Sequence, residues 1–230
     1  MQKNCNFQTH LKYNFLLKLF KILSITVTSL LLIIISFLHY QQFPIYEWEF
    51  ILEYIKDNRQ KEDFNSIATK LGYNENDKLL IIHADDVGLS KSVNESTFES
   101  FKNNSITSAA IIMNTYEMEE GLKFAVENPN FDFGVHLTVT SEWKYHKWGG
   151  ILDKAKTPSL HNSVNNFYWN KRKFVKNADL NEIKMELQAQ ISLAKSMGLK
   201  PSHIDSHEGA LFFDPNIFKI YIDLAIENDL

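Results

Sequence analysis

The sequence has almost no cysteine and no excess of positive charge. Its 230 residues include one cysteine, Cys5, so both an internal disulfide bond and a structural zinc site built from several thiolates are excluded. With 24 Lys and Arg against 28 Asp and Glu, the formal net charge is −4, which argues against a nucleic-acid-binding protein with a basic surface. Hydrophobic residues make up 44% of the chain, so a disordered chain is excluded as well.

Features that commonly bind phosphate groups are also scarce. The chain has no glycine-rich phosphate loop, and its two arginines, Arg59 and Arg172, lie outside every motif described below. A phosphorylated substrate is therefore disfavoured, because arginine forks and backbone amides of glycine-rich loops are the usual phosphate ligands.

One uncharged apolar segment runs from Ile22 to Leu38, seventeen residues in all. This is at the short end of the roughly 17–25 residues that cross a bilayer. Lys18 and Lys21 precede it and acidic residues follow from Glu47, so the positive-inside tendency places the N-terminus in the cytoplasm and the rest outside. A cleaved signal peptide has the same layout, but no small-x-small cleavage site follows, which favours an uncleaved signal anchor over secretion after cleavage. A buried core helix is a third interpretation.

The chain divides by composition into three parts. Residues 1–40 form a basic tail and the anchor, residues 41–77 a polar connector with short amphipathic helices, and residues 78–230 an acidic body. In the first 45 residues there are four lysines and no acid, so the remainder carries 20 Lys and Arg against 28 Asp and Glu. We therefore expect a membrane-anchored protein with its soluble body on the extracytoplasmic side.

The body alternates apolar strand patterns with amphipathic helix patterns. Strands are predicted at Lys78–His83, Ile106–Met113, Phe133–Val139 and Ser202–Ser206, and helices at Ser92–Asn104, Met118–Asn128, Leu180–Met197 and after Asp214-Pro215. Four strand–helix units in succession predict an α/β fold with a parallel sheet, either doubly wound or barrel-like. A loop of about forty residues, rich in aromatics, separates the third strand from the next helix, and loops of that length are usually functional.

Polar side chains collect where three of these strands end. They are the pair Asp85-Asp86, then His136, and then the alternating set His203-x-Asp205-x-His207. Taken singly, the Asp pair is typical of a helix cap and His136 of a core histidine. However, the carboxyl ends of parallel strands meet at one edge, where sites are built. Three ionisable groups on one strand face would also cost several kcal/mol each unless something such as a cation compensates them.

The simplest assembly is a divalent metal ion held by one carboxylate and two imidazoles, with positions left for water and substrate. A neighbouring carboxylate would take a proton from the attacking water. These residue types therefore indicate metal-assisted hydrolysis.

Four motifs carry a resemblance to a known family. The stretches Leu80-Ile-Ile-His-Ala-Asp-Asp-Val-Gly-Leu-Ser90, Ile106-Thr-Ser-Ala109, Phe133-Gly-Val-His-Leu-Thr138 and Pro201-Ser-His-Ile-Asp-Ser-His207 resemble the motifs of the YdjC-like carbohydrate deacetylases. That family includes the chitooligosaccharide deacetylases and has a (β/α)-barrel-like, TIM-barrel-like fold. The resemblance spans about residues 68–230.

The resemblance implies a role for individual residues. Asp86, His136 and His207 would be the metal ligands, and Asp85 would be the general base that activates water. Family members are usually described with Mg²⁺, whereas an Asp/His/His set suits Zn²⁺, Mn²⁺ or Co²⁺ at least as well.

Two departures from the family pattern stand out. The last motif is followed by Glu208-Gly209 rather than by further histidines, and the long loop contains Glu142-Trp143 and Trp148-Gly149. These are features of a less-characterised branch, so chitobiose is not assumed as the substrate. Family members also continue beyond the helix at 215–228, so we expect an incomplete, C-terminally truncated version of the fold.

Four more residues have candidate roles. His203 could protonate the leaving amine, Asp205 could orient a ligand imidazole, and Trp143 and Trp148 could stack on a sugar ring. For each, a purely structural role is the alternative.

The sequence thus predicts a metal-dependent hydrolase that removes N-acetyl groups from an amino-sugar oligosaccharide, with a carbohydrate and the membrane as partners. A metal-dependent esterase is a second interpretation. The third is a membrane-tethered metal- or carbohydrate-binding protein, or an inactive truncated deacetylase.

Overall fold

The computed structural model describes residues 18–36 and 68–230, which belong to two units, Met1–Glu62 and Asp63–Leu230. In the first unit the described residues form one helix, Lys18–Ser36, long and apolar enough to cross a membrane; a signal sequence or a buried core helix passes the same test. Residues 37 and 38 of the predicted span, and residues 41–67 of the predicted connector, lie outside the described residues.

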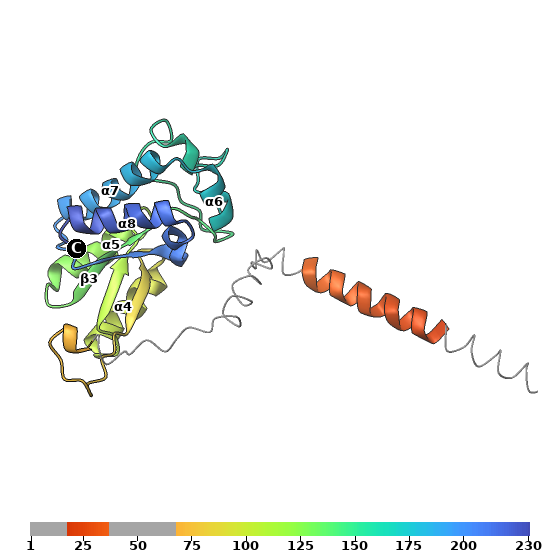
Figure 1. The fold of residues 1–230 in the computed structure, drawn as a ribbon, viewed down its shortest axis with the longest axis horizontal. Helices are drawn as coiled ribbons and strands as arrows, with labels where there is room; N and C mark the ends of the chain where they lie inside the picture. Colours follow the sequence, from red (N-terminus) through yellow and green to blue (C-terminus); the bar gives the residue numbers. More distant parts are fainter. Residues whose placement is uncertain (1–17, 37–67) are drawn as a thin grey trace, which may run out of the picture. The chain divides into compact units, whose positions relative to one another are not determined.

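The second unit alternates strands with helices along the chain (Figure 1). The elements are β1 (His83–Val87), α4 (Lys91–Lys102), β2 (Ser108–Ile111), α5 (Met118–Glu127), β3 (Asp132–Leu137), the 3-10 helix η1 (Pro158–Leu160), α6 (Lys171–Asn177), α7 (Leu180–Ser196), β4 (Ile204–Ser206), the 3-10 helix η2 (His207–Phe212) and α8 (Pro215–Glu227). All four predicted helices are confirmed to within two residues at each end.

The four strands form one parallel sheet in the order β1-β2-β3-β4. This confirms the predicted α/β class with a parallel sheet. In a doubly wound sheet the strand order reverses partway across, whereas here each strand lies beside the one before it. Right-handed crossovers then place successive helices on the same face of the sheet, the arrangement of consecutive units in a β/α barrel.

Helix α7 shows how the sequence pattern produces this packing. Its buried apolar residues recur every three or four positions, at Ile183, Leu187, Ile191 and Ala194. This face packs on β3, and α8 packs beside α7. The Asp179 side chain caps the start of α7 by accepting from the backbone N–H groups of Asn181 and Glu182, and Gly198 ends it with a φ of 97°. A left-handed residue just after a helix is the ordinary role of glycine.

The prediction for the first strand is wrong in position. It placed the strand at Lys78–His83, but β1 runs from His83 to Val87, and the side chains of Leu80 and Ile81 are 76% and 75% exposed. Backbone pairing begins at Ile82, whose carbonyl accepts from Thr107 and Ser108. The residues before Ile82 lie beyond Ser108, the first residue of β2. The apolar segment of the sequence therefore begins before the sheet begins.

The strand at the third polar cluster is also shorter than predicted. It runs from Ile204 to Ser206 rather than from Ser202. Only Asp205 of the alternating set lies in the strand; His203 precedes it and His207 begins η2. The prediction that these three side chains share one strand face is therefore wrong, because the chain turns at His207.

The segment between β3 and α7, predicted as one long loop, contains η1 and α6 and is fastened to α7 by two buried polar side chains. Glu186 accepts from the backbone N–H groups of Ile151 and Leu152, at 2.8 and 3.0 Å. Gln190 bonds both backbone groups of Thr138 and donates to Glu186. Both side chains are fully buried, so the loop is held on the scaffold by charge-assisted hydrogen bonds.

We expect Glu186→Ala to lower the free energy of unfolding by about 2 kcal/mol, because the partly buried N–H groups of Ile151 and Leu152 lose their acceptor. Urea denaturation of the full-length chain in detergent, followed by far-UV circular dichroism, measures the change. Glu95→Ala on the exposed side of α4 is the matched control and should change stability by less than about 0.5 kcal/mol. Equal losses in the two variants would contradict this role for Glu186.

Candidate metal centre

The carboxyl ends of the strands bring together side chains that are far apart in sequence. Asp85 and Asp86 lie near the end of β1, His136 lies near the end of β3, and Asp205 and His207 lie in and just after β4. His136 and Asp205 are partners in the register of β3 and β4. Parallel strands end at the same edge of the sheet, so these groups converge there.

Asp86 is held in place by an unusual backbone. The pairing of β1 with β2 shifts register around it, and its φ of 64° lies in the left-handed region, which costs a non-glycine residue of the order of 1–2 kcal/mol. Two buried side chains fix the next turn: Asn94 accepts from the N–H of Gly88 at 2.7 Å, and Thr115 donates to the carbonyl of Gly88 at 2.7 Å. Strain of this kind is typical of functional positions.

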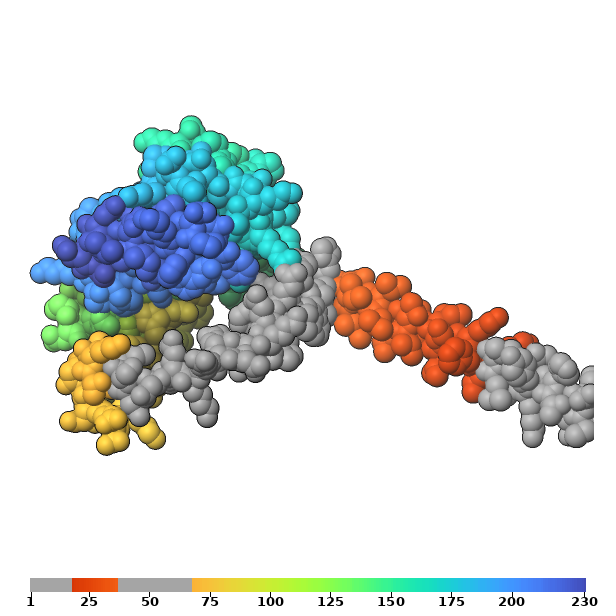
Figure 2. Space-filling model, in the orientation of Figure 1, coloured from red at the N-terminus to blue at the C-terminus, as the bar shows by residue number. Residues whose placement is uncertain are grey.

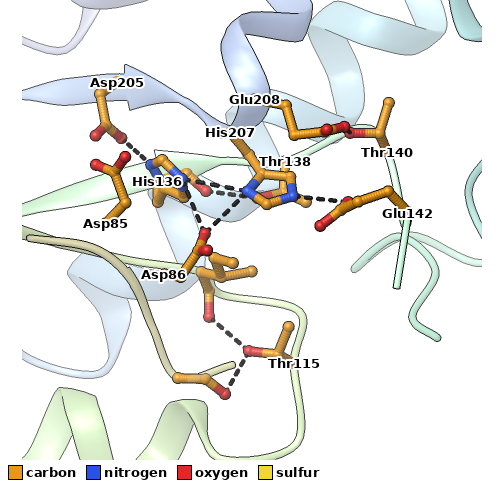
Figure 3. A network of polar contacts seen from close by, with 12 residues as sticks. Asp85, Asp86, Thr115, His136, Thr138, Thr140, Glu142, Asp205, His207 and Glu208 are labelled. Carbon is orange, nitrogen blue, oxygen red and sulfur yellow. Dashed lines mark hydrogen bonds and ion pairs between the residues drawn. The ribbon is translucent and has the colours of Figure 1, made fainter. Parts of the chain in front are cut away.

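Three potential ligand atoms meet at this point (Figure 3). Oδ1 of Asp86 lies 3.2 Å from Nε2 of His136 and 3.0 Å from Nδ1 of His207, and the two ring nitrogens are 3.3 Å apart. Both histidines are buried, at 2% and 3% exposure. One carboxylate oxygen and two imidazole nitrogens, all within 4.8 Å of one another, are a donor set that suits a divalent transition metal.

Each of these histidines also contacts a second carboxylate on its other side. Nδ1 of His136 lies 2.5 Å from Oδ1 of Asp205, and Nε2 of His207 lies 2.9 Å from Oε2 of Glu142 (Figure 3). The sequence predicts an orienting role for Asp205 but none for Glu142. No spacing pattern connects Glu142 with a histidine 65 residues later, so only the course of the loop brings it here.

The carboxylates set the charge of the cluster. Burial favours the neutral imidazole of His207, but its contacts with Asp86 and Glu142 outweigh burial and raise its pKa to about 10. Burial is likewise outweighed at His136, where Asp205 and Asp86 raise the pKa to about 9. Burial alone would raise the pKa of Asp86, yet the two histidines hold it well below its usual range. The neighbouring carboxylates therefore favour the protonated over the neutral imidazole at both positions.

Asp85 faces a different neighbour. Its side chain is 61% exposed, and its Oδ1 lies 3.4 Å from Nε2 of His83, which also lies 2.9 Å from Oδ2 of Asp205. These three residues form a second group of potential ligands. The sequence pattern predicts His83 as the last residue of the first strand and gives it no role in the site. The spacing of two residues between His83 and Asp85 is the signal that their side chains share one face of a strand.

His203 is not brought into the first group. Its Nδ1 lies 2.7 Å from Oγ of Ser202, and its ring meets that of His83 edge-on with centroids 5.2 Å apart. A glycine at position 134 makes room for it, because a Cβ there would lie 2.4 Å from the His203 ring. Burial lowers the pKa of His203.

The two tryptophans singled out in the long loop differ in exposure. Trp143 is 49% exposed, whereas Trp148 is only 4% exposed. The ring of Trp148 packs edge-on against His207, with centroids 5.9 Å apart, and its buried Nε1 has no hydrogen-bond partner among the described residues. The ring of Trp148 thus helps to enclose His207, and only Trp143 offers an open face.

We expect the metal-free protein to lose stability as pH rises from about 7 to about 10. The folded-state pKa values of His136 and His207, about 9 and about 10, lie above the ordinary value of 6.5. Their stabilising contribution is therefore complete below pH 6.5 and is lost as pH rises through the folded values.

Urea titrations in EDTA at pH 7 and pH 10 test this for the wild type and for His207→Gln. The stability difference between the two proteins should be smaller at pH 10. A difference that is constant or grows with pH would contradict the charged assignment.

The chain is similar to known proteins over this region. The family model described as YdjC-like protein matches residues 79–230. A carbohydrate deacetylase from Clostridium beijerinckii is 30% identical over 151 residues, which is 66% of this chain and 58% of that protein. One from Geobacillus stearothermophilus is 35% identical over 145 residues, 63% and 55% of the two chains. A chitooligosaccharide deacetylase from Yersinia pestis is 30% identical over 158 residues, 67% and 58%.

A similar solved structure is the crystal structure of an Enterococcus faecalis protein provisionally described as a cellobiose-phosphate cleavage protein. It is 28% identical, with a TM-score of 0.60, and the match covers 65% of this chain and 56% of that one. The chain spans a little more than half the length of the curated relatives it matches. The matched region includes the whole parallel sheet and the group of Asp86, His136 and His207, and the chain belongs to the YdjC-like protein family.

Proposed function

We propose that this protein is a metal-dependent hydrolase that removes N-acetyl groups from a carbohydrate built of amino sugars. The observation that carries the proposal is the convergence of Asp86, His136 and His207 at the carboxyl edge of the sheet. Relatives with up to 35% identity over this region are named carbohydrate deacetylases. The names of these relatives support the reaction class, and the geometry supports the choice of residues.

Asp86, His136 and His207 would hold one divalent metal ion. Their three ligand atoms already face one another, and both imidazoles are buried. A bound cation would polarise the amide carbonyl and increase the acidity of water. The resemblance favours Mg²⁺, and the two nitrogen ligands suit Zn²⁺, Mn²⁺ or Co²⁺.

We assign the general-base role to Asp85. It directly precedes Asp86. Its side chain is 61% exposed, whereas the side chains of Asp86 and Asp205 are 28% and 26% exposed. Water can therefore reach it, while His83 lies 3.4 Å away and can limit its orientations. Asp85 would accept the proton of the attacking water.

We assign sugar binding to Trp143. Trp143 is half exposed and directly follows Glu142, whose side chain contacts His207, so Trp143 belongs to the part of the loop that reaches the site. The role of His203 as proton donor to the leaving amine stays a prediction; its ring contacts Ser202 and His83 rather than the Asp86 group.

We expect the purified full-length chain to bind one divalent ion and to release acetate from N-acetylated chitooligosaccharides. Asp86→Ala, His136→Ala and His207→Ala should each lose the metal. Asp85→Asn should keep the metal and lose about 10²- to 10⁴-fold in turnover, the usual contribution of a general base. Elemental analysis gives the metal content, and an enzymatic acetate assay gives the turnover with added Mg²⁺, Mn²⁺, Co²⁺ or Zn²⁺.

Glu95→Gln on the surface of α4 is the control and should match the wild type in both measurements. Release of acetate from O-acetylated but not N-acetylated sugars would replace the proposal with a metal-dependent esterase. Stoichiometric metal without acetate release from either substrate would favour a metal- or carbohydrate-binding protein. A folded wild type that takes up no metal would refute the site itself.

We further propose that helix Lys18–Ser36 anchors the protein in a membrane, with the catalytic unit on the extracytoplasmic side. The helix is long and apolar enough to cross a bilayer. Lys18 and Lys21 lie at its N-terminal end, which the positive-inside tendency assigns to the cytoplasm.

A C-terminal alkaline phosphatase fusion expressed in a Gram-negative bacterium should be active and should sediment with the membranes, because that reporter folds only outside the cytoplasm. The double substitution Leu31→Lys and Ile34→Lys should abolish both properties, since each lysine opposes insertion by about 3 kcal/mol. An active fusion found only in the soluble periplasmic fraction would show a cleaved signal peptide. An inactive wild-type fusion would overturn the topology.

A further inference from the structure

The long loop after β3 contributes a carboxylate to the candidate metal centre. Oε2 of Glu142 lies 2.9 Å from Nε2 of His207, and the Glu142 side chain is 24% exposed beside a histidine side chain that is 3% exposed. The carboxylate of Glu208 lies within 4.8 Å of the Glu142 and His207 ligand atoms, and it accepts a hydrogen bond from the hydroxyl of Thr140 at 3.4 Å (Figure 3). Glu142 thus contacts the ring nitrogen of His207 that faces away from Asp86.

The two candidate ligand histidines face Asp86 with different ring nitrogens. His136 turns Nδ1 toward Asp205 and presents Nε2 to Asp86. His207 does the reverse: it turns Nε2 toward Glu142 and presents Nδ1 to Asp86. Each imidazole thus has one nitrogen facing an orienting carboxylate and the other facing the shared centre.

This arrangement decides which nitrogen can bind a metal ion. A neutral imidazole carries one N–H and one lone pair, and a carboxylate accepts the N–H. The lone pair is then left on the other nitrogen, so the carboxylate fixes both the tautomer and the orientation of the ring. For His207 the nitrogen left for a metal is Nδ1, and the residue that determines this is Glu142.

Glu142 is itself positioned by the first turn of the loop. Its neighbour Ser141 is fully buried, accepts from the N–H of Trp148 with its hydroxyl, and donates its own N–H to the carbonyl of Tyr168. Lys147 donates to the carbonyl of Ser141 at 2.7 Å. These contacts close the segment 141–148 into a turn that covers His207, with Trp148 on one side of the ring and Glu142 on another.

We propose that Glu142 is a positioning residue that makes His207 bind the metal ion through Nδ1, and that it thereby couples metal binding to the loop between β3 and α7. This inference rests on the metal site of the proposed function. It goes beyond that function by assigning a ligand atom to His207 and a role to a loop residue that the sequence pattern did not connect with the centre.

Zn²⁺ binding by the full-length chain tests the proposal. Glu142→Ala should weaken Zn²⁺ affinity about 10- to 100-fold, the usual effect of removing a carboxylate that orients a ligand histidine. Glu142→Gln keeps an acceptor oxygen for the Nε2 proton and should recover much of the loss. Asp153→Asn, an exposed acid in the same loop, should bind like the wild type. Isothermal titration calorimetry gives the affinities, and circular dichroism confirms folding.

A second measurement reads the ring nitrogens directly. With ¹⁵N-labelled histidine and bound Zn²⁺, the two-bond ¹H–¹⁵N spectrum of the wild type should show His207, assigned by its loss in His207→Gln, with its proton on Nε2. A proton on Nδ1, or equal Zn²⁺ affinity of Glu142→Ala and the wild type, would overturn the proposal.

These readouts do not depend on catalysis. A wild type that binds Zn²⁺ through Nδ1 of His207 but releases no acetate would refute the deacetylase and leave the role of Glu142 standing. A wild type that releases acetate, together with a Glu142→Ala variant that binds Zn²⁺ as tightly as the wild type, would support the deacetylase and refute the role of Glu142. A wild type that binds no divalent ion would overturn both.

Discussion

The candidate centre depends on one constraint: two imidazoles are buried side by side, and each of their four nitrogens needs a polar partner. A buried polar group without a partner costs up to several kcal/mol. Here three carboxylates meet the requirement, with Asp86 shared between His136 and His207 on the inner side and Asp205 and Glu142 on the outer sides. The same partners that stabilise protonated imidazoles would orient neutral ones toward a cation.

That constraint explains why so much of the scaffold is polar inside. Asp86 needs its left-handed backbone, so Asn94 and Thr115 are buried to hold the turn that follows it. Glu142 needs the loop after β3, so Glu186 and Gln190 are buried on α7 to hold that loop against the sheet. Asn94, Glu186 and Gln190 lie on helices that follow strands, so three of these four supports stand on rigid elements, and Thr115 lies in the loop between β2 and α5.

The layout also links the site to the surfaces around it. Trp148 closes over His207 from the same turn that carries Glu142, and Trp143 between them is half exposed. A ligand that contacts Trp143 would therefore act on the segment that orients a candidate metal ligand. Proton and metal binding are coupled as well, because an imidazole must lose its proton before it can bind a metal ion.

The sequence by itself determined the order and type of the four strands and of helices α4, α5, α7 and α8, because apolar spacing and capping residues such as Asp179 act over a few neighbouring positions; it did not predict α6 or the two 3-10 helices. Chain order also indicated that polar groups from three strand ends meet at one edge of a parallel sheet, whereas the choice of Asp86, His136 and His207 among them came from the resemblance to the YdjC-like family. Tertiary structure decided where pairing begins, so β1 starts at His83 rather than at Lys78, because a strand needs a partner alongside it. It also decided that Glu142 joins the centre, that His203 stays outside it and that Trp148 is buried. These outcomes depend on how a long loop folds back onto the strand ends, and contacts between residues so far apart leave no periodic trace in the sequence.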